Sequence, residues 1–333
     1  MVIQDQDTTN CDGFLVSDDI RTGFISGATF TNKAIQYSVV DGLAVFEGCI
    51  VLGTVEEMEE KTAAIRAGEE IEEEDSARGV FIPGKKYRWP DGIVPYEIDA
   101  NLPNQKRIND AIAHWEAKTS IRFVRRTSSN ASQYPNYIYF KPANGCWSQV
   151  GMRGGKQDIG LGGGCGTSAT IHEIGHALGL WHEQSREDRD KHIQIHWQNI
   201  KPENLHNFNQ HITDGDDYDS YDYDSIMHYG STAFSKNGKP TITTIPSGKP
   251  IGKSNGLSDR DIATIEFMYQ GKAPTKSRPY TIQQGDTLYL IAQRELGDGS
   301  RWREIVKTPE GGSFTEEEAQ NLQPGQVVYL PLT

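Results

Sequence analysis

The chain lacks several features that would assign it to a specific class. Its 333 residues contain only four cysteines, and no two have the C-x-x-C spacing of a cysteine-based zinc cluster. No apolar run reaches about eighteen residues, the length of a membrane-spanning helix, so we expect no membrane span. Internal repeats are not evident either.

Positive charge is also scarce. The net charge is −13, with 33 Lys and Arg against 46 Asp and Glu. Residues 1–78 hold 17 acidic and 5 basic residues, so nearly all of the negative excess lies in the first part of the chain. Because no basic stripe is present, we expect no nucleic-acid partner.

The sequence does contain a run with metal-binding spacing, His172-Glu173-x-x-His176-x-x-Gly179-x-x-His182. On a helix, residues four apart share a face, so two imidazoles can point at one metal ion with Glu173 beside it. Gly179 can adopt the left-handed conformation that ends a helix and lets the chain return His182 as a third ligand. Three protein ligands leave one zinc position open for water, as in a catalytic site. The alternative is a helix whose histidines are merely half buried.

This pattern is the metzincin signature, whose second element is a Met-turn. Residues 223–230, Tyr-Asp-Ser-Ile-Met-His-Tyr-Gly, resemble the Met-turn of the astacin family. The resemblance implies an α+β fold, with a two-lobed astacin-like catalytic domain around an active-site helix. It also implies that Met227 packs beneath the metal ligands, and that Tyr229 binds zinc at rest and then swings to stabilise the oxyanion.

The resemblance to astacins spans residues 79–271. Residues 87–96 are similar to the start of the mature catalytic domain, 195–200 to the segment after the zinc signature, and 257–262 to the closing helix. Within it, apolar residues spaced three and four apart at 108, 111, 112 and 115 predict a packed helix. Short strands are predicted at 121–124 and 137–140, and Thr167 or Ser168 is predicted to cap the active-site helix.

The chemistry that these residues predict is peptide hydrolysis with one Zn²⁺ per chain. Zinc would lower the pKa of its bound water and polarise the scissile carbonyl. Glu173 is the expected general base. The expected substrates are proteins or peptides.

In astacins, the cysteines that match Cys146 and Cys165 form a disulfide, which implies an oxidising compartment. The alternative is two reduced, buried thiols. The second disulfide common in the family has no counterpart here.

Residues 1–78 are predicted to form an inhibitory prosegment. Phe46-Glu47-Gly48-Cys49 resembles the F-x-G-D motif of astacin prosegments, whose aspartate reaches the zinc and displaces the catalytic water. A thiolate is a good zinc ligand, so Cys49 is a candidate cysteine switch, with Cys11 as the lesser candidate. The flanking apolar residues also suit a buried strand, in which Cys49 would be only a small hydrophobe.

Activation by cleavage is the expected release of this block. The acidic stretch 56–75 is predicted to be a solvated helix or connector, and Arg78-Gly79 then offers a basic cleavage point. In astacins the new amino terminus is buried against the acid that follows the third histidine, here Glu183.

After a linker at residues 272–279, residues 280–333 resemble a LysM module, a small βααβ unit. LysM modules bind N-acetylglucosamine-containing glycans, which makes peptidoglycan or chitin an expected partner. Residues 308–319 depart from the module's pattern, so a purely structural or docking role stays open.

The predicted disulfide, prosegment and LysM-like tail indicate a secreted or cell-envelope-associated protein, although residues 1–7 lack the basic start and apolar core of a signal peptide. The leading interpretation is a latent zinc endopeptidase. The alternative is a cell-wall glycan-binding adhesion protein with a non-proteolytic zinc domain. The intact ligand histidines, Glu173 and Tyr229 favour the first.

Overall fold

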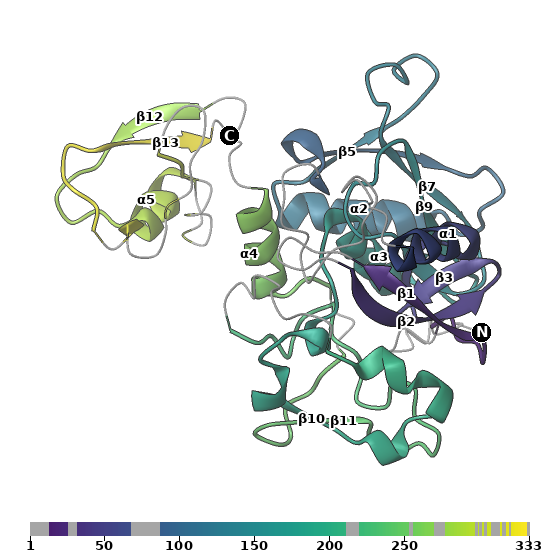
Figure 1. Cartoon of the computed structure of the whole chain (residues 1–333). Coiled ribbons are helices and arrows are strands. Elements are labelled where there is room, and N and C mark those ends of the chain that lie inside the picture. The colour runs from purple at the N-terminus through teal and green to yellow at the C-terminus, as the bar shows by residue number, and fades with distance from the viewer. Residues whose placement is uncertain are drawn as a thin grey trace, which may run out of the picture. The chain divides into compact units, whose positions relative to one another are not determined.

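The computed structural model describes residues 13–25, 32–67, 87–210, 220–252, 256–269, 277–296, 299, 302, 305–307, 314, 318–319 and 321–331. The chain divides into two compact units, Met1–Ile265 and Glu266–Thr333 (Figure 1). The division falls inside helix α4 (Asp259–Met268), before the predicted linker.

The first unit contains a nine-stranded sheet with the strand order β1-β2-β3-β4-β8-β9-β7-β5-β6. Five strands come from the region predicted to be catalytic: β5 (Ile93–Ile98), β6 (Arg122–Arg125), β7 (Tyr137–Pro142), β8 (Cys146–Ser148) and β9 (Lys156–Leu161). β6, β5, β7 and β9 run parallel, whereas β8 is antiparallel to β9. The parallel strands carry fully buried apolar side chains such as Ile138 and Phe140, as expected for strands covered on both faces.

Two helices pack together beside this sheet. Helix α2 (Lys106–Lys118) buries the predicted stripe of residues 108, 111, 112 and 115, so that prediction is confirmed. Trp115 Nε1 donates to the carbonyl of Ile171 at 3.2 Å, which joins α2 to helix α3 (Thr167–Leu178).

The predicted cap of α3 is wrong. Gly166 takes the extended N-cap conformation, with φ −84° and ψ −171°, so the helix already begins at Thr167. Thr167 and Ser168 therefore lie inside the first turn, and the cap carries no side-chain hydrogen bond.

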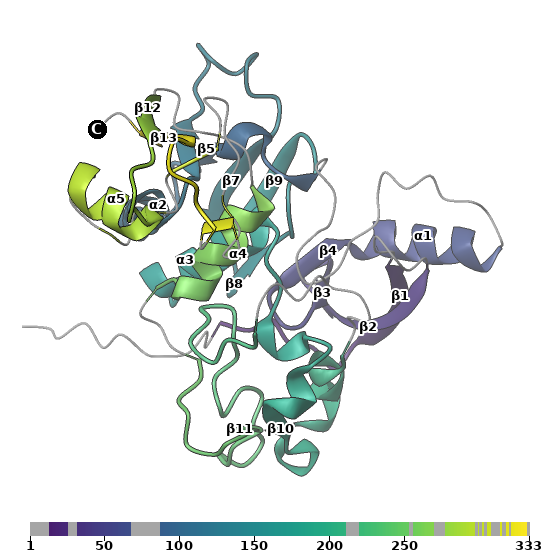
Figure 2. The same ribbon diagram turned by 90° about the vertical axis from the view of Figure 1, so that its left-hand side faces the viewer.

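Residues 13–67, which we call the front segment, form four strands and a helix. β1 (Ile20–Ile25), β2 (Lys33–Val40), β3 (Leu43–Phe46) and β4 (Ile50–Thr54) pair antiparallel in chain order. Strand β4 joins the edge of β8 through the pair Ile50 and Ser148, so the front segment extends the sheet. Figure 2 shows β1 to β4 together with α1 on one side of β7 and β9.

The acidic stretch begins as helix α1 (Val55–Arg66). Thr54 and Glu57 form a capping box at its start, and only Met58 and Thr62 of the helix are buried. Residues 68–86, which include the predicted cleavage point Arg78-Gly79, lie outside the described residues, as does Cys11.

The chain after α3 makes short 3₁₀ turns and a small sheet. These elements are η4 (Glu183–Ser185), η5 (Arg189–Lys191), β10 (Ile193–Ile195), η6 (Trp197–Asn199), η7 (Pro202–Phe208) and β11 (Ile242–Thr244), and η3 (Pro90–Gly92) precedes β5. β10 and β11 pair antiparallel below the large sheet (Figure 1). Their core is an aromatic and aliphatic cluster that includes Phe208, Tyr229 and Phe234. The first unit thus contains the large sheet with its helices and a second body built around this cluster.

The second unit contains β12 (Ser277–Thr281), α5 (Leu288–Glu295) and β13 (Val327–Pro331), and the two strands pair antiparallel. Ile291, Val328 and Leu330 belong to its apolar core. The second helix of the predicted βααβ unit would fall largely on residues outside those described. In the part of the chain that the structure describes, no helix is long and apolar enough to cross a membrane.

Candidate metal centre and active site

Helix α3 brings the histidines of the signature together. His172 and His176 lie one turn apart on α3, and Gly179 ends the helix in the left-handed region with φ 110°. The reversed chain places His182 beside them. One ligand atom from each of these histidines and from Cys49 lies within 4.8 Å of the others, and all four side chains are buried.

Each histidine is held in one orientation by its Nδ1 atom. The Nδ1 of His172 donates to the carbonyl of Ile226 at 2.8 Å, and that of His176 to the carbonyl of Leu180 at 2.7 Å. Because a carbonyl oxygen can only accept, the proton must lie on Nδ1 and the Nε2 lone pair faces the common point. Burial lowers the pKa of His172 to about 4, so its ring is neutral near pH 7.

Glu173 directly follows His172 in α3. Its side chain is fully buried, and neither carboxylate oxygen has a hydrogen-bond partner among the described residues. Burial raises the pKa of Glu173 well above its usual value, whereas a nearby cation would act in the opposite direction. An orphaned carboxylate beside three imidazoles and a sulfur atom fits a zinc site with a water position.

Cys49 faces the three histidines from the front segment. It lies in the turn between β3 and β4, where Glu47 and Gly48 have positive φ angles of 47° and 74°. Its Sγ lies 3.2 Å from Nε2 of His182, 3.4 Å from that of His176 and 3.6 Å from that of His172. Cys49 is thus buried, as the alternative interpretation required, but in the turn that faces the imidazoles and not within a strand.

Glu47 is a site residue that the sequence analysis missed. Its Oε2 lies 2.7 Å from Nδ1 of His182, and its Oε1 accepts the hydroxyl of Ser185 at 2.5 Å. Its backbone carbonyl also accepts the hydroxyl of Tyr229 at 2.7 Å. The available signal was a glutamate inside an apolar run, since a carboxylate buried there must find donors.

The Met-turn lies under the histidines. Gly175 of α3 lets Met227 approach, because a Cβ at this glycine would be 2.8 Å from the methionine Sδ. The ring centroid of Tyr229 is 4.8 Å from that of His182. Asp261 of α4 fixes the turn by accepting the hydroxyl of Ser225 at 2.6 Å, together with a backbone amide.

Glu183 lies next to the third histidine and is partly buried, with a side chain that is 14% exposed. Its Oε1 accepts the amide of Asp222 at 2.7 Å and lies 3.5 Å from Nε of Arg186. Burial is the main cause that raises the pKa of Glu183 to about 8.

A disulfide joins Cys146 and Cys165, with their Cα atoms 5.9 Å apart, and so ties β8 to the start of α3. The outer edge of β8 is occupied by the front segment. The amide of Ser148 donates to the carbonyl of Cys49 at 3.0 Å, and the amide of Cys146 to the carbonyl of Gly13 at 3.2 Å.

Comparisons with known proteins agree with this geometry. The family model for the astacin peptidases matches residues 81–270. The zinc metalloproteinase nas-6 of Caenorhabditis elegans is 41% identical over 219 residues, covering 64% of this chain and 62% of the nematode protein. High choriolytic enzyme 2 of Oryzias latipes is 43% identical over 183 residues, covering 53% of this chain and 63% of the fish protein.

A solved structure is similar as well. High choriolytic enzyme 1, a hatching enzyme zinc-protease from the same fish, matches with a TM-score of 0.50 and 40% identity, covering 55% of this chain and 92% of that one. The chain spans less than two thirds of the length of nas-6 and about a third of nas-15, also from C. elegans, with 62% and 34% covered. The family model covers more than half of the chain, and the residues that it matches include the three histidines, Glu173 and the Met-turn. This chain therefore belongs to the astacin family of zinc metallopeptidases.

Proposed function

We propose that the chain is a zinc endopeptidase made as a latent precursor, with residues 1–78 as its inhibitory prosegment. The observation that carries the proposal is the convergence of Cys49 with three histidine Nε2 atoms beside a buried, unpartnered Glu173. In this arrangement His172, His176 and His182 would hold a zinc ion, and the Cys49 thiolate would be a fourth ligand in place of the catalytic water.

Once the prosegment has left, Glu173 takes a proton from the attacking water and passes it to the leaving amine. Bound zinc supplies Lewis acidity, which lowers the pKa of that water and polarises the scissile carbonyl. Tyr229 loses its Glu47 acceptor and is then able to donate to the developing oxyanion. The vacated amides of Cys146 and Ser148 on β8 can bind the substrate backbone as an added strand.

Glu173→Gln tests the catalytic role. The activated variant should cleave no peptide yet retain stoichiometric zinc, because the glutamine keeps the volume but accepts no proton. Glu187→Gln, a change of the same kind at an exposed position, is the matched control. Full activity in activated Glu173→Gln would defeat the assignment.

Cys49→Ser tests latency. Without the thiolate, the intact precursor should cleave a peptide substrate or process itself at once. Cys49→Asp is the rescue variant, since a carboxylate can also ligate zinc, and it should stay latent. Unchanged latency in Cys49→Ser would rule out the switch.

We propose cleavage at Arg78-Gly79 as the activation step. Glu183 supports this, because a partly buried carboxyl next to His182 can receive an ammonium group that exists only after the chain is cut. N-terminal sequencing of the active form should find Gly79 at the start. A start well beyond Tyr87 would contradict this site.

We propose that residues 280–333 bind peptidoglycan or chitin and so hold the enzyme at a wall. Tyr289 and Leu290 on α5 support this, since they are 55% and 50% exposed and offer an apolar surface for sugar rings. The full chain should sediment with insoluble peptidoglycan or chitin, and Tyr289→Ala should weaken this.

The disulfide supports secretion or attachment to the cell envelope. A chain that binds the glycans but cleaves no peptide after activation would favour the adhesion alternative.

A further inference from the structure

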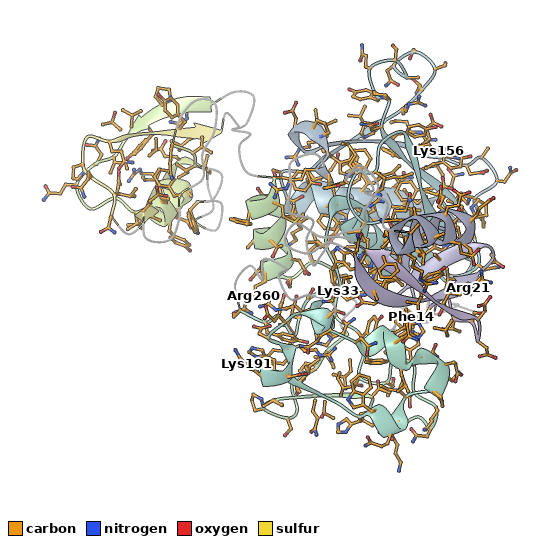
Figure 3. All side chains as sticks on the ribbon, viewed as in Figure 1. Phe14, Arg21, Lys33, Lys156, Lys191 and Arg260 are labelled. Carbon is orange, nitrogen blue, oxygen red and sulfur yellow. A yellow bond between two sulfur atoms is a disulfide. The ribbon has the colours of Figure 1, made fainter. Side chains whose placement is uncertain are left out.

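An aromatic side chain of the front segment lies beside the metal centre. The ring of Phe14 stacks on that of Phe234, with centroids 4.4 Å apart and an interplanar angle of 23°. It meets the ring of Tyr229 edge-on at 5.2 Å. In Figure 3, Phe14 is labelled where the purple front segment meets the teal ribbon of the following body.

Backbone contacts fix Phe14 next to the turn that faces the histidines. The amide of Leu15 donates to the carbonyl of Gly48 at 2.7 Å. A Cβ on Gly48 would lie 2.8 Å from Cδ1 of Phe14 and 2.7 Å from Cζ of Phe234. Gly48 directly precedes Cys49, whose Sγ faces the three imidazoles. Phe14 therefore packs against the residue next to Cys49.

The walls that receive Phe14 do not belong to the front segment. Phe234 and Tyr229 contact each other with centroids 5.6 Å apart, and Phe208 packs on Phe234 at 5.8 Å. All three follow the zinc signature in the sequence and would remain after residues 1–78 leave. Removal of Phe14 then uncovers ring faces of Phe234 and Tyr229 next to the metal centre.

We propose that this recess, lined by Phe234 and Tyr229, is a substrate subsite for an aromatic or large apolar side chain near the scissile bond. The inference rests on the proposed endopeptidase function. Flat rings take up other rings by offset stacking and edge-on contact, which a small side chain cannot match. A charged side chain would lose its hydration against these walls.

The test uses the activated enzyme and peptides that differ only at one position, within three residues of the cleaved bond, as Phe, Leu, Ala or Asp. At one of these positions, kcat/KM should be at least tenfold higher for Phe than for Ala, and lowest for Asp. Phe234→Ala should reduce the Phe-to-Ala ratio at least threefold, and Phe234→Tyr should preserve it. Leu205→Ala, at a 37% exposed position in the same body, is the matched control and should keep the wild-type ratio.

Two failures are distinguishable. If no peptide is cleaved, the proposed endopeptidase function fails. If peptides are cleaved without preference for Phe or Leu at any of these positions, or if Phe234→Ala keeps the ratio, the subsite is refuted and the endopeptidase function stands. If Phe234→Ala does not fold, Phe234→Leu decides, because it keeps an apolar wall but offers no ring for stacking. It should reduce the Phe-to-Ala ratio, and an unchanged ratio in this variant would refute the subsite.

Discussion

Glu47 offers a sharp test of how the front segment acts on the metal centre. Its carboxylate is fully buried and accepts from two donors, Nδ1 of His182 at 2.7 Å and the hydroxyl of Ser185 at 2.5 Å. Glu47→Gln keeps the shape but replaces one acceptor oxygen by an amide nitrogen. If the amide oxygen stays on Nδ1 of His182, the amide nitrogen faces the hydroxyl of Ser185, which must turn to accept, and the negative charge beside His182 is lost.

The expected effect is a loss of zinc affinity in the precursor. Removing the outer hydrogen-bond partner of a ligating histidine typically weakens metal binding about 10- to 100-fold, which corresponds to about 1.4 to 2.7 kcal/mol. Loss of the buried charge acts in the same direction, because hydrogen bonds to charged groups contribute about 1.5 to 3 kcal/mol and neutral ones about 0.5 to 1.5 kcal/mol. The side chains of His182 and Glu47 are both fully buried, so water does not screen this difference.

Chelator competition measures this affinity in the intact precursor and again after activation. Glu47→Gln should lower zinc affinity only before activation, because the proposed cleavage at Arg78-Gly79 removes residue 47. Glu60→Gln, at an exposed position of α1, is the control and should match the wild type in both states. Equal affinities of the Glu47→Gln and wild-type precursors would refute the reasoning, and so would an equal loss in both states.

Three further predictions concern the rest of the first unit. Tyr229→Phe should lower kcat about 10²- to 10³-fold in steady-state assays of the activated enzyme, as loss of an oxyanion donor does, and an unchanged kcat would contradict that role. The double variant Cys146→Ser, Cys165→Ser should lose about 3 kcal/mol of unfolding free energy in urea, because the disulfide closes a loop with a sequence separation of 19. Burial raises the pKa of Asp261 from 3.8 to about 6, so the folded state binds this proton more tightly than the unfolded state. Its contribution to stability is therefore full below about pH 4 and falls by about 3 kcal/mol as the pH rises through about 6. Asp261→Asn should remove that decline relative to the wild type in unfolding titrations at pH 4 and 7, and identical pH profiles would contradict it.

Local sequence signals correctly predicted the elements that depend only on residues close together in the chain. The spacing of His172 and His176 is that of one helical face, and a glycine in the left-handed region ends the helix at Gly179. The apolar stripe of α2 was predicted for the same reason, since a period near 3.6 fixes which side chains are buried. The cap of α3 was wrong because the exact start of a helix depends on the preceding backbone, here Gly166.

Contacts between distant segments were beyond this reasoning. Glu47 and His182 are 135 residues apart in the sequence, and the position of Glu47 in F-x-G gave it no assigned role. Phe14 had no motif at all. Its place follows from the pairing of Leu15 with Gly48, and hydrophobic periodicity carries no information about such a pairing. Sequence patterns therefore predicted the histidine cluster and the candidate role of Cys49, but not the contacts that Glu47 and Phe14 make beside it.

The front segment contacts three parts of the site through Phe14, Glu47 and Cys49. Phe14, Glu47 and Cys49 come from two stretches of chain that the Leu15 to Gly48 hydrogen bond holds together. The turn that presents Cys49 to the metal centre also presents Glu47 to His182 and to Tyr229, because positive φ angles at residues 47 and 48 reverse the chain there. These contacts depend on β4 lying against the edge of β8, so separating that edge would disrupt all of them together. In the proposed precursor, the front segment thereby also supports the third histidine, and we expect this precursor to retain zinc while it is latent.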